Sequence, residues 1–411
     1  HTFICSNSWL DVGYGVWLQE FLLNRCPVEF IIDNHAKRSF EAADVNTIIS
    51  VISAPCKKVD PQHPVKFVAF KKPFEEAIYT ENLLAIEDAD KIISNKTFRV
   101  YPITEKALKE AGTEYESEEK KKLGAGKYEG DKWGGKYLRA PDIFFTILEK
   151  GKEYIDTFDN YFIGERYLNT GGADGFFILT NVSSQNKEYF NVVNEKVLNN
   201  KTGPFSGIIE KEFLKKLIKD QTKQDKKIEI GKADAWCLVI DDNQQNKKIK
   251  KYIEWGERQG YNQRSVTINQ HPWFKPTNQM KNGAEVLLPR SFNDTFVTYF
   301  NPQKHLSLRF YRLHPKNNLT RELTAFLNST LFWFLFESLG NKNQGQGVLD
   351  FYMEDFLKMK IPIVLKTESK KTFDTIKNRQ INTIYEECGI DSESKTPIEE
   401  QEPNPLPDRA E

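Results

Sequence analysis

The sequence predicts an α/β protein with two structured parts, the end of an α/β sheet followed by a mixed α/β domain. The first seventy residues alternate between β-rich runs and one helical pattern, an order typical of such a sheet. A charged, glycine-rich segment follows near residue 113, and strand-like and helix-like runs then continue to about residue 390. Hydrophobic residues make up 39% of the 411 residues, which is enough for a real core.

The first part, residues 1–112, begins with a strand and a helix. Apolar residues at 17, 18, 21 and 22 have the spacing of an amphipathic helix over residues 14–24, and Pro27 is placed to end it. Strands are expected at residues 2–6, 28–33, 45–52 and 65–70. One helix followed by several strands fits the end of an α/β sheet, where parallel order gives way to antiparallel hairpins. The pattern of residues 74–110 is helical and mixed.

A domain boundary is expected in residues 113–136, which are charged and glycine-rich with little to bury and therefore predict a linker or exposed loop. The second domain would span residues 137–390, and residues 391–411 would form an acidic, proline-containing tail. The strands expected in the second domain are residues 174–180, 235–241, 285–288 and 295–300. The helices expected there are residues 140–151, 210–220, 247–260 and 319–339.

The charge balance excludes two whole-chain descriptions. Because 58 Lys and Arg residues balance 58 Asp and Glu residues, neither a strongly basic nucleic-acid coat nor an acidic coat covers the whole chain. Residues 391–411 carry a net charge of −5, so the rest of the chain is mildly basic and compatible with an anionic partner.

Cysteine usage and hydropathy indicate a cytoplasmic protein. The five cysteines have no zinc-ligand spacing and predict reduced structural thiols. The most apolar stretch, residues 323–339, is short for a membrane span of about 20 residues, so we expect a buried helix and no membrane partner.

The chain shows no complete catalytic apparatus of its own. Its six histidines are scattered without paired-ligand spacing, and we therefore expect no metal site. A GxSxG nucleophile motif and a phosphate-loop lysine motif are both absent from the sequence.

The opening block resembles the second half of an adenine-N6 DNA methyltransferase domain. The block runs FICSNSWLDVGYGVWLQEFLL and then IIDNHAKRSFEAADVNTIISVI. In bacterial type II restriction–modification enzymes of this kind, a strand ends in a Ser/Asn/Trp segment, a helix follows, and the next strand leads into a loop that carries an aromatic residue. The resemblance implies that Phe40 stacks on an adenine flipped out of the duplex, because the enzyme cannot reach a stacked base. In that reading, Arg38 or Lys37 would supply a phosphate contact. The alternative is that Phe40 is a core residue at the start of a strand.

The C-terminal part resembles the target recognition domain of large restriction–methylation enzymes of the same family. The segments that carry this resemblance, in the expected order, are KYLRAPDIFFTIL, IGERYLNTGGADGFFIL, HPWFKP, EVLLPRSFNDTFVTYFNP, LTAFLNSTLFWFLFESLGNKNQGQGVLDFYMEDFLKMKIPI and PNPLPDR. The family binds S-adenosylmethionine on a glycine-containing loop and orients the adenine with an Asn-Pro-Pro-Tyr/Phe loop, and neither motif occurs here. We therefore expect a C-terminal fragment, inactive and without bound cofactor on its own, whose partners are double-stranded DNA and the N-terminal half of the same polypeptide.

The recognition domain should contact DNA through polar side chains on loops, since Arg suits guanine, Asn and Gln suit adenine, and Lys mostly binds phosphates. Each candidate could instead be an ordinary solvated surface residue. The candidate DNA-binding residues are Arg38, Arg166, Asn169, Thr170, Arg258, Gln259, Asn262, Gln263, Arg264, Lys275, Asn343 and Gln344.

Two functions of different classes remain open from the sequence. The first is a fragment of a site-specific adenine-N6 DNA methyltransferase that retains mainly sequence recognition. The second is a non-catalytic DNA-specificity or protein-interaction module, and RNA as the target is a further possibility. Apolar surface left exposed by a missing half would promote self-association of the fragment.

Overall fold

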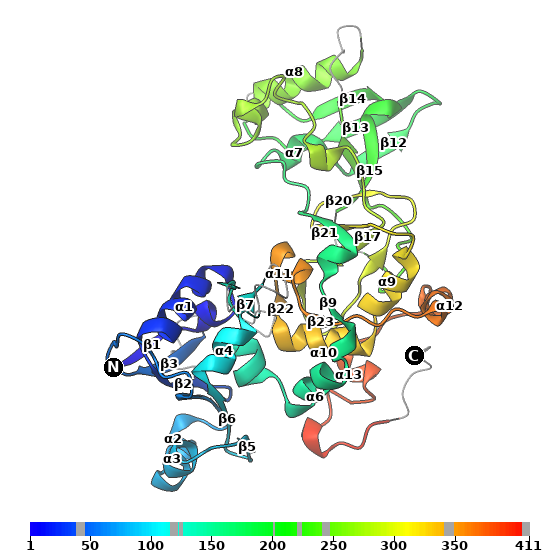
Figure 1. Cartoon of the computed structure of the whole chain (residues 1–411). Helices are drawn as coiled ribbons and strands as arrows, with labels where there is room; N and C mark the ends of the chain where they lie inside the picture. Colours follow the sequence, from blue (N-terminus) through cyan, green and yellow to red (C-terminus); the bar gives the residue numbers. More distant parts are fainter. Residues whose placement is uncertain are drawn as a thin grey trace. The chain divides into compact units, whose positions relative to one another are not determined.

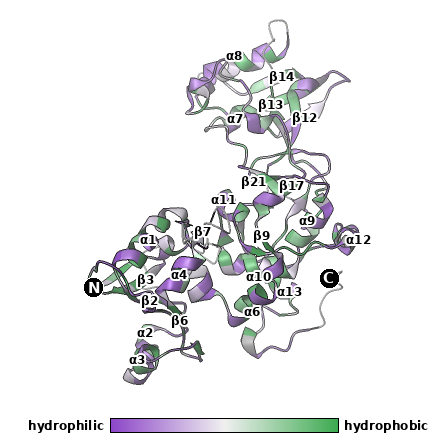
Figure 2. Cartoon of the chain, in the orientation of Figure 1, coloured by the Kyte–Doolittle hydropathy of each residue, from purple (hydrophilic) through white to green (hydrophobic). Residues whose placement is uncertain are grey.

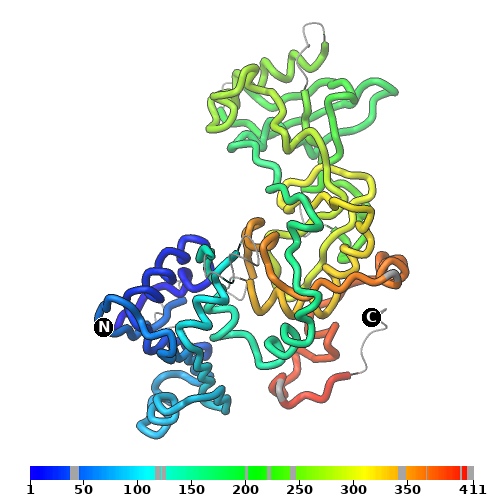
Figure 3. Tube along the Cα trace, viewed as in Figure 1, coloured from blue at the N-terminus to red at the C-terminus, as the bar shows by residue number. Residues whose placement is uncertain are grey.

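The computed structural model describes residues 1–37, 46–115, 122, 126–199, 202–219, 224–240, 247–340 and 349–404. The chain divides into two compact units, and neither is continuous in sequence. Unit 1 comprises His1–Lys152 and Phe334–Phe351, and unit 2 comprises Glu153–Trp333 and Tyr352–Glu411. The chain therefore leaves unit 1 after Lys152 and returns to it briefly at Phe334 (Figure 3).

Unit 1 is built on a six-stranded sheet with the order β1-β3-β2-β4-β6-β5 (Figure 1). In that order the strands are Thr2–Ser6, Thr47–Ile52, Val28–Asn34, Pro64–Phe70, Phe98–Thr104 and Ile93–Ser94. β3 is antiparallel to both β1 and β2, while β2 and β4 are parallel. Strands β1, β2 and β4 therefore point the same way, with antiparallel strands inserted between and beside them. The expected α/β fold class, with parallel order giving way to antiparallel pairing, is confirmed.

The helices and short strands of unit 1 follow the sheet strands along the chain. They are η1 (Asn7–Leu10), η2 (Gly13–Gly15), α1 (Val16–Arg25), α2 (Phe74–Ala77), α3 (Thr80–Glu87), α4 (Glu105–Ala111), β7 (Thr113–Glu114), β8 (Lys127–Tyr128), η3 (Gly134–Arg139), α6 (Asp142–Lys150) and β22 (Leu349–Asp350). Helix α1 ends just before Pro27, as the sequence predicts. Its last hydrogen bond runs from Cys26 N to Leu22 O at 2.9 Å.

The expected linker at residues 113–136 is wrong for the part that the structure describes. Tyr128, Trp133, Tyr137 and Leu138 belong to the same hydrophobic core as the first strands and α1, and Trp133 has no exposed surface. Tyr128 and Trp133 are large, so their burial anchors this charged segment although it contains few apolar residues. Unit 1 accordingly extends to Lys152 rather than ending at residue 112.

Strand β6 is the second departure from the expected pattern, which was helical and mixed between residues 74 and 110. β6 pairs with β4 along its whole length, yet it contains Pro102, which usually argues against a sheet strand. On its other side β6 pairs with β5 only at Arg99 and Val100. Pro102 lies beyond that short ladder, so β6 is effectively an edge strand there and tolerates the missing N–H.

Unit 2 contains several small sheets rather than one large one. A four-stranded antiparallel sheet has the order β10-β21-β17-β19, a second has the order β11-β16-β15-β20, and a three-stranded antiparallel sheet has the order β12-β13-β14. The strands of unit 2 are β9 (Ile155–Asp156), β10 (Phe162–Glu165), β11 (Ile178–Leu179), β12 (Asn181–Ser184), β13 (Tyr189–Asn194), β14 (Phe205–Glu210), β15 (Leu214–Ile218), β16 (Ala235–Leu238), β17 (Val286–Pro289), β18 (Ser291–Phe292), β19 (Tyr299–Phe300), β20 (Leu306–Ser307), β21 (Phe310–Pro315) and β23 (Ile361–Pro362).

The helices of the second part of the chain confirm some expectations and correct others. They are α7 (Asp174–Phe177), α8 (Ile249–Gln259), α9 (Thr320–Leu327), α10 (Thr330–Leu339), α11 (Met353–Leu357), α12 (Thr367–Ile376) and α13 (Ile384–Glu387), with single turns η4 (Lys152–Tyr154), η5 (Phe158–Asn160), η6 (Lys211–Phe213), η8 (Tyr261–Gln263), η9 (Thr267–Asn269), η10 (Asn278–Met280) and η11 (Ile398–Glu400). Helix α8 lies where residues 247–260 predict it. Hydrophobic residues dominate α10 (Figure 2), and no helix of the described chain is long and apolar enough to cross a membrane.

Two helix predictions in this part are wrong because tertiary contacts decide the conformation. Residues 214–218 form β15 instead of a helix, because their backbone pairs with β16 on one side and β20 on the other. The side chains of Leu214, Leu217 and Ile218 are buried. The long helix expected at residues 319–339 is broken at Asn328. The Asn328 carboxamide ends α9 by bonding to Thr298 N at 3.0 Å and to Thr298 O at 2.9 Å.

Apolar side chains are exposed on β1 and on the segment that follows it in unit 1. Phe3 and Ile4 on β1 are 53% and 58% exposed, and Tyr14 and Trp17 are 71% and 72% exposed. Surface of this kind favours contact with another chain or segment. Self-association of the fragment stays a prediction.

Glu105 is a buried carboxyl group at the start of α4. It is 3% exposed, its Oε1 accepts a hydrogen bond from Val28 N at 3.2 Å, and its Oε2 has no partner among the described residues. Burial raises the pKa of Glu105 from 4.5 to about 7, and the nearby Glu29 carboxylate acts in the same direction. The folded state therefore retains a proton that the unfolded chain has already released.

We expect the free energy of unfolding to fall as pH rises from about 4.5 to about 7, because the unfolded chain binds fewer protons in that window. Replacing Glu105 with Gln should remove this contribution, as measured by urea unfolding at a series of pH values. The exposed Glu110→Gln variant on the same helix is the control and should keep the wild-type slope. Equal slopes for wild type and Glu105→Gln would contradict the assignment.

Candidate nucleic-acid interface

Two polar loops of unit 2, residues 169–174 and 261–267, lie side by side. The Ser265 hydroxyl donates a hydrogen bond to Gly171 O at 2.9 Å. Gly171 has φ +60°, and a Cβ there would lie 2.1 Å from Val266 Cγ2. The backbone of the first loop therefore packs directly on the second, and only glycine permits both the conformation and the close approach.

A buried aromatic cluster supports both loops from beneath. Phe176 in α7 stacks on Tyr252 of α8 with ring centroids 4.9 Å apart, and Tyr261 packs against the Phe176 ring at 5.9 Å. Tyr261 is 1% exposed, and burial raises its pKa, so the phenol stays protonated at neutral pH and donates to Lys196 O at 2.6 Å. Gly260 with φ +86° ends α8 and turns the chain into the second loop.

The turn that carries Lys275 is fixed to the same helix. The Trp273 indole N–H donates to Glu257 Oε1 at 2.9 Å, and its ring lies 4.6 Å from that of Phe176. The two loops and the turn at residues 271–275 therefore lie at the C-terminal end of α8. The exposed predicted residues there are Arg258, Gln263, Arg264 and Lys275.

Two predicted DNA-binding residues serve the fold instead. Gln259 is 3% exposed; its Oε1 accepts from Leu198 N at 2.7 Å and from Asn199 N at 3.0 Å, while its Nε2 donates to Thr202. Thr170 is also 3% exposed, and its hydroxyl donates to the Asp174 carboxylate. Neither side chain has a polar group available for a base edge in this conformation, so both predictions are corrected.

Of three further predicted residues, Arg166 and Asn169 have defined local roles and Asn262 does not. Arg166 pairs with Glu354 Oε1 at 2.8 Å, and that hydrogen bond lowers the pKa of Glu354. Asn169 Oδ1 accepts from Gly171 N at 2.8 Å and so shapes the loop of residues 169–174, which we call the glycine loop. Asn262 is half-buried, and its Oδ1 has no hydrogen-bond partner among the described residues.

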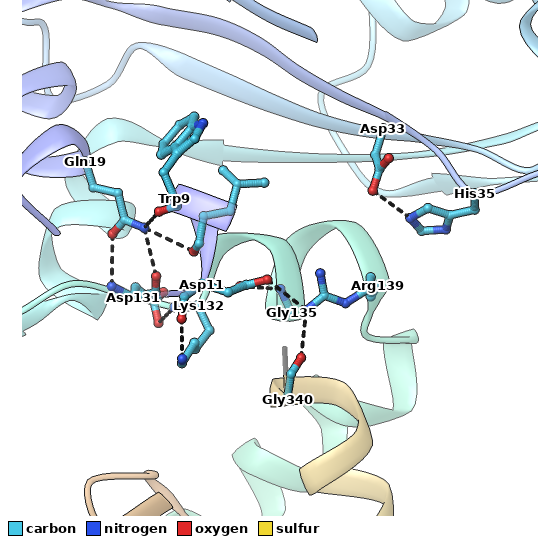
Figure 4. A network of polar contacts seen from close by, with 11 residues as sticks. Trp9, Asp11, Gln19, Asp33, His35, Asp131, Lys132, Gly135, Arg139 and Gly340 are labelled. Atoms are coloured by element: carbon cyan, nitrogen blue, oxygen red, sulfur yellow. Dashed lines mark hydrogen bonds and ion pairs between the residues drawn. The ribbon is translucent and has the colours of Figure 1, made fainter. Parts of the chain in front are cut away.

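In unit 1, the carboxyl ends of β1, β2 and β4 meet at one edge of the sheet, where open α/β sheets bind ligands. Asp33 Oδ2 lies 3.4 Å from His35 Nε2, and His35 N donates to Phe70 O at 2.9 Å (Figure 4 shows the Asp33–His35 pair). Asn7 N donates to Asn46 O at 3.0 Å. The residues that precede and follow residues 38–45 are therefore fixed at this edge. The predicted residues that lie outside the described part of the chain are Arg38, Phe40, Asn343 and Gln344.

A polar network next to this edge joins distant segments of unit 1 (Figure 4). Gln19 Nε2 donates to Leu10 O at 3.1 Å and to Asp131 O at 3.1 Å, while Gln19 Oε1 accepts from Asp131 N at 3.1 Å. Asp11 Oδ2 pairs with Arg139 at 2.9 Å, and Arg139 also donates to Gly340 O at 3.1 Å. Most polar groups of the network bond to one another, although Arg139 Nε has no hydrogen-bond partner among the described residues, and the network joins distant segments of unit 1.

The described residues contain neither a metal-ligand group nor a disulfide. Within them, no group of three His, Cys, Asp or Glu side chains is placed to hold a metal ion. All five cysteines are free thiols, and burial raises the pKa of Cys237 to about 12.

Sequence reasoning missed Ser265 in the second loop and Lys196, a neighbour of that loop. Ser265 links the loops through Gly171 O, and Lys196 supplies the carbonyl that accepts from Tyr261. Both roles depend on tertiary contacts, for which the sequence carried no local pattern.

Comparison with known proteins identifies a family and several similar solved structures. Residues 169–389 match the family described as the type II methyltransferase M.Eco57I, C-terminal domain. No curated protein matches the sequence significantly. Among solved structures, the type IIG restriction endonuclease BpuSI matches with a TM-score of 0.41 and 12% sequence identity. That alignment covers 95% of this chain and 43% of the BpuSI chain, so this chain spans less than half of that protein.

The glycine loop provides a matched series of substitutions. Gly171→Ala should destabilise the protein by about 2 kcal/mol or more, because it combines a left-handed backbone with overlap on Val266. Gly172→Ala, at φ +86° with the nearest atom 4.0 Å away, should cost only the backbone strain of about 1–2 kcal/mol.

Gly203 is the control, because nothing lies within 4 Å of its added Cβ. Gly203→Ala should be neutral or slightly stabilising in chemical unfolding. If Gly171→Ala proved as stable as Gly203→Ala, the packing of the two loops would be refuted.

Proposed function

Because this chain belongs to the family of the type II methyltransferase M.Eco57I C-terminal domain, we propose that it is the sequence-recognition part of a site-specific adenine-N6 DNA methyltransferase from a restriction–modification system. The family match covers residues 169–389, which include both loops and α8. Duplex DNA is the proposed partner of unit 2. The rest of the same polypeptide is the proposed partner of unit 1.

The loop pair of unit 2 is the observation that best supports DNA binding. Arg258, Arg264 and Lys275 are exposed and make no ion pair with described residues, although most other arginines of unit 2 are paired. Lysine and arginine side chains that have no partner in the protein are available to phosphate oxygens and base edges. A rigid aromatic base beneath them keeps the interface in one conformation before DNA arrives, which lowers the entropic cost of binding.

Unit 1 would contribute part of the pocket for the flipped base. The chain on both sides of residues 38–45 is fixed at the carboxyl edge of the sheet, which supports a role for Phe40 near a ligand. In this proposal Phe40 stacks on the extruded adenine, an interaction worth about 1–3 kcal/mol per base. Arg38 would contact a flanking phosphate.

S-adenosylmethionine is the methyl donor that the proposal implies for the intact enzyme. The glycine-containing loop that binds it in the resembled family does not occur in this sequence. The space at Gly15, the most tightly packed glycine of unit 1, is filled by the carbonyl of Trp9, which would lie 1.9 Å from an added Cβ. We therefore derive no step through the cofactor from this chain.

Duplex binding by the 411-residue chain tests the proposal. We expect a fluorescently labelled pool of random duplexes to bind, with an affinity that falls steeply with salt because bound counterions are released. Arg258→Ala and Lys275→Ala should each weaken binding to all duplexes and lower the salt slope by about 1.

Arg321→Ala is the matched control, since Arg321 pairs with Asp374 at 3.4 Å on α9 and α12, and it should leave the slope unchanged. Failure to bind duplexes, or displacement by single-stranded RNA at lower concentration than by duplex DNA, would refute the proposal.

The role of Phe40 is tested in the intact enzyme. Phe40→Ala should lower the rate of methyl transfer far more than it weakens duplex binding, because the stacking partner of the flipped base is lost while groove contacts remain. Phe40→Tyr keeps a stacking face and should retain most activity. Equal losses of methylation and binding in Phe40→Ala would show that the residue belongs to the core instead.

A further inference from the structure

Arg264 lies in the second loop, where its main chain is hydrogen-bonded at both its N–H and its carbonyl. Arg264 N donates to Tyr261 O at 3.3 Å, and Arg264 O accepts from Ile268 N at 2.9 Å. The Thr267 hydroxyl lies 2.6 Å from Tyr261 O and 3.3 Å from Arg264 O, and Thr267 has no exposed surface. The main chain at Arg264 is therefore fixed on a buried support.

The neighbouring residue fastens this support to the glycine loop. Ser265 binds Gly171 O at 2.9 Å, and Val266 fills the space where Gly171 would otherwise carry a side chain. Arg264 Cδ lies 4.0 Å from the position of an added Cβ at Gly172, so the arginine stem runs past a residue with no side chain.

The guanidinium itself has no partner in the described chain. Arg166, Arg312, Arg321 and Arg379 each pair with a carboxylate, whereas Arg264 is exposed and makes no ion pair with described residues. The main chain of Arg264 is fixed, and the N–H groups of its guanidinium have no carboxylate partner among the described residues. This combination suits a contact that requires the same geometry each time. Reading of a base edge demands such geometry, whereas a phosphate contact tolerates a mobile side chain.

We propose that Arg264 is a specificity-determining residue that reads a guanine, with its two parallel N–H donors directed at the O6 and N7 acceptors in the major groove. Guanine is the base whose edge offers two adjacent acceptors to this fork. Arg258 and Lys275, at the end of α8 and on the adjoining turn, then serve mainly as phosphate contacts. This inference rests on the proposed function, because it requires unit 2 to bind duplex DNA.

The test compares the 411-residue wild type with Arg264→Lys in selection from a random-sequence duplex library. Lysine keeps the charge but loses the planar fork, so it separates the two kinds of contact. We expect the wild type to enrich a motif that contains a guanine, and the variant to enrich the same motif with about tenfold less preference for guanine at one position. Affinity of the variant for unselected duplexes should stay within about twofold of wild type, since the phosphate contacts remain.

Arg321→Lys is the matched control and should enrich the wild-type motif unchanged, because Arg321 is occupied by Asp374. Thermal unfolding of all three proteins confirms that the exposed substitutions leave the fold intact. An unchanged motif from Arg264→Lys, or an equal loss of affinity for every sequence, would overturn the inference while leaving the proposed function in place. A wild type that enriches no motif would overturn the proposed function itself, and the inference with it.

Discussion

The buried ion pair between Asp11 and Arg139 joins three parts of unit 1 that lie far apart in the sequence. Asp11 is 4% exposed; its Oδ2 binds Arg139 at 2.9 Å and its Oδ1 accepts from Gly135 N at 2.9 Å. Arg139 also donates to Gly340 O at 3.1 Å, at the point where the chain has returned from unit 2. Loss of one partner would leave a buried charge unpaired, which typically costs about 3–5 kcal/mol. The chain can therefore carry most of unit 2 as an insertion between two parts of unit 1.

Buried polar contacts also hold the loop pair of unit 2 in place. Residues that point inward, such as Tyr261 and Gln259, use their polar atoms on backbone partners and fix the loops. Residues that point outward, such as Arg264, are left with donors for an external ligand. In the proposed function, a stable support with unpaired outward cations would suit DNA reading, because a side chain that starts from a fixed main chain reaches a base edge in a reproducible position.

The sequence predicts the elements whose periodicity is local, and it fails where tertiary contacts decide. Strand β1 and helix α8 lie where the β-rich run at residues 2–6 and the helix expected at residues 247–260 predict them. Polar residues suited to DNA contacts selected parts of the two loops, although the sequence could not show that the loops lie side by side. It misassigned β15, whose Leu and Lys spacing also fits a helix, since burial between two strands decides its conformation. It also could not show that Gln259 faces inward, because Gln259 directly follows the exposed Arg258 in α8.

Expression of the full-length gene in a host free of adenine methylation tests the central claim most directly. N6-methyladenine in the host DNA would be mapped by single-molecule sequencing. If this chain is the recognition part of a site-specific adenine methyltransferase, one recurrent motif should be methylated across the genome. Absence of methylation from a well-expressed, folded full-length protein would contradict that claim and favour a specificity or interaction module without methyltransferase activity.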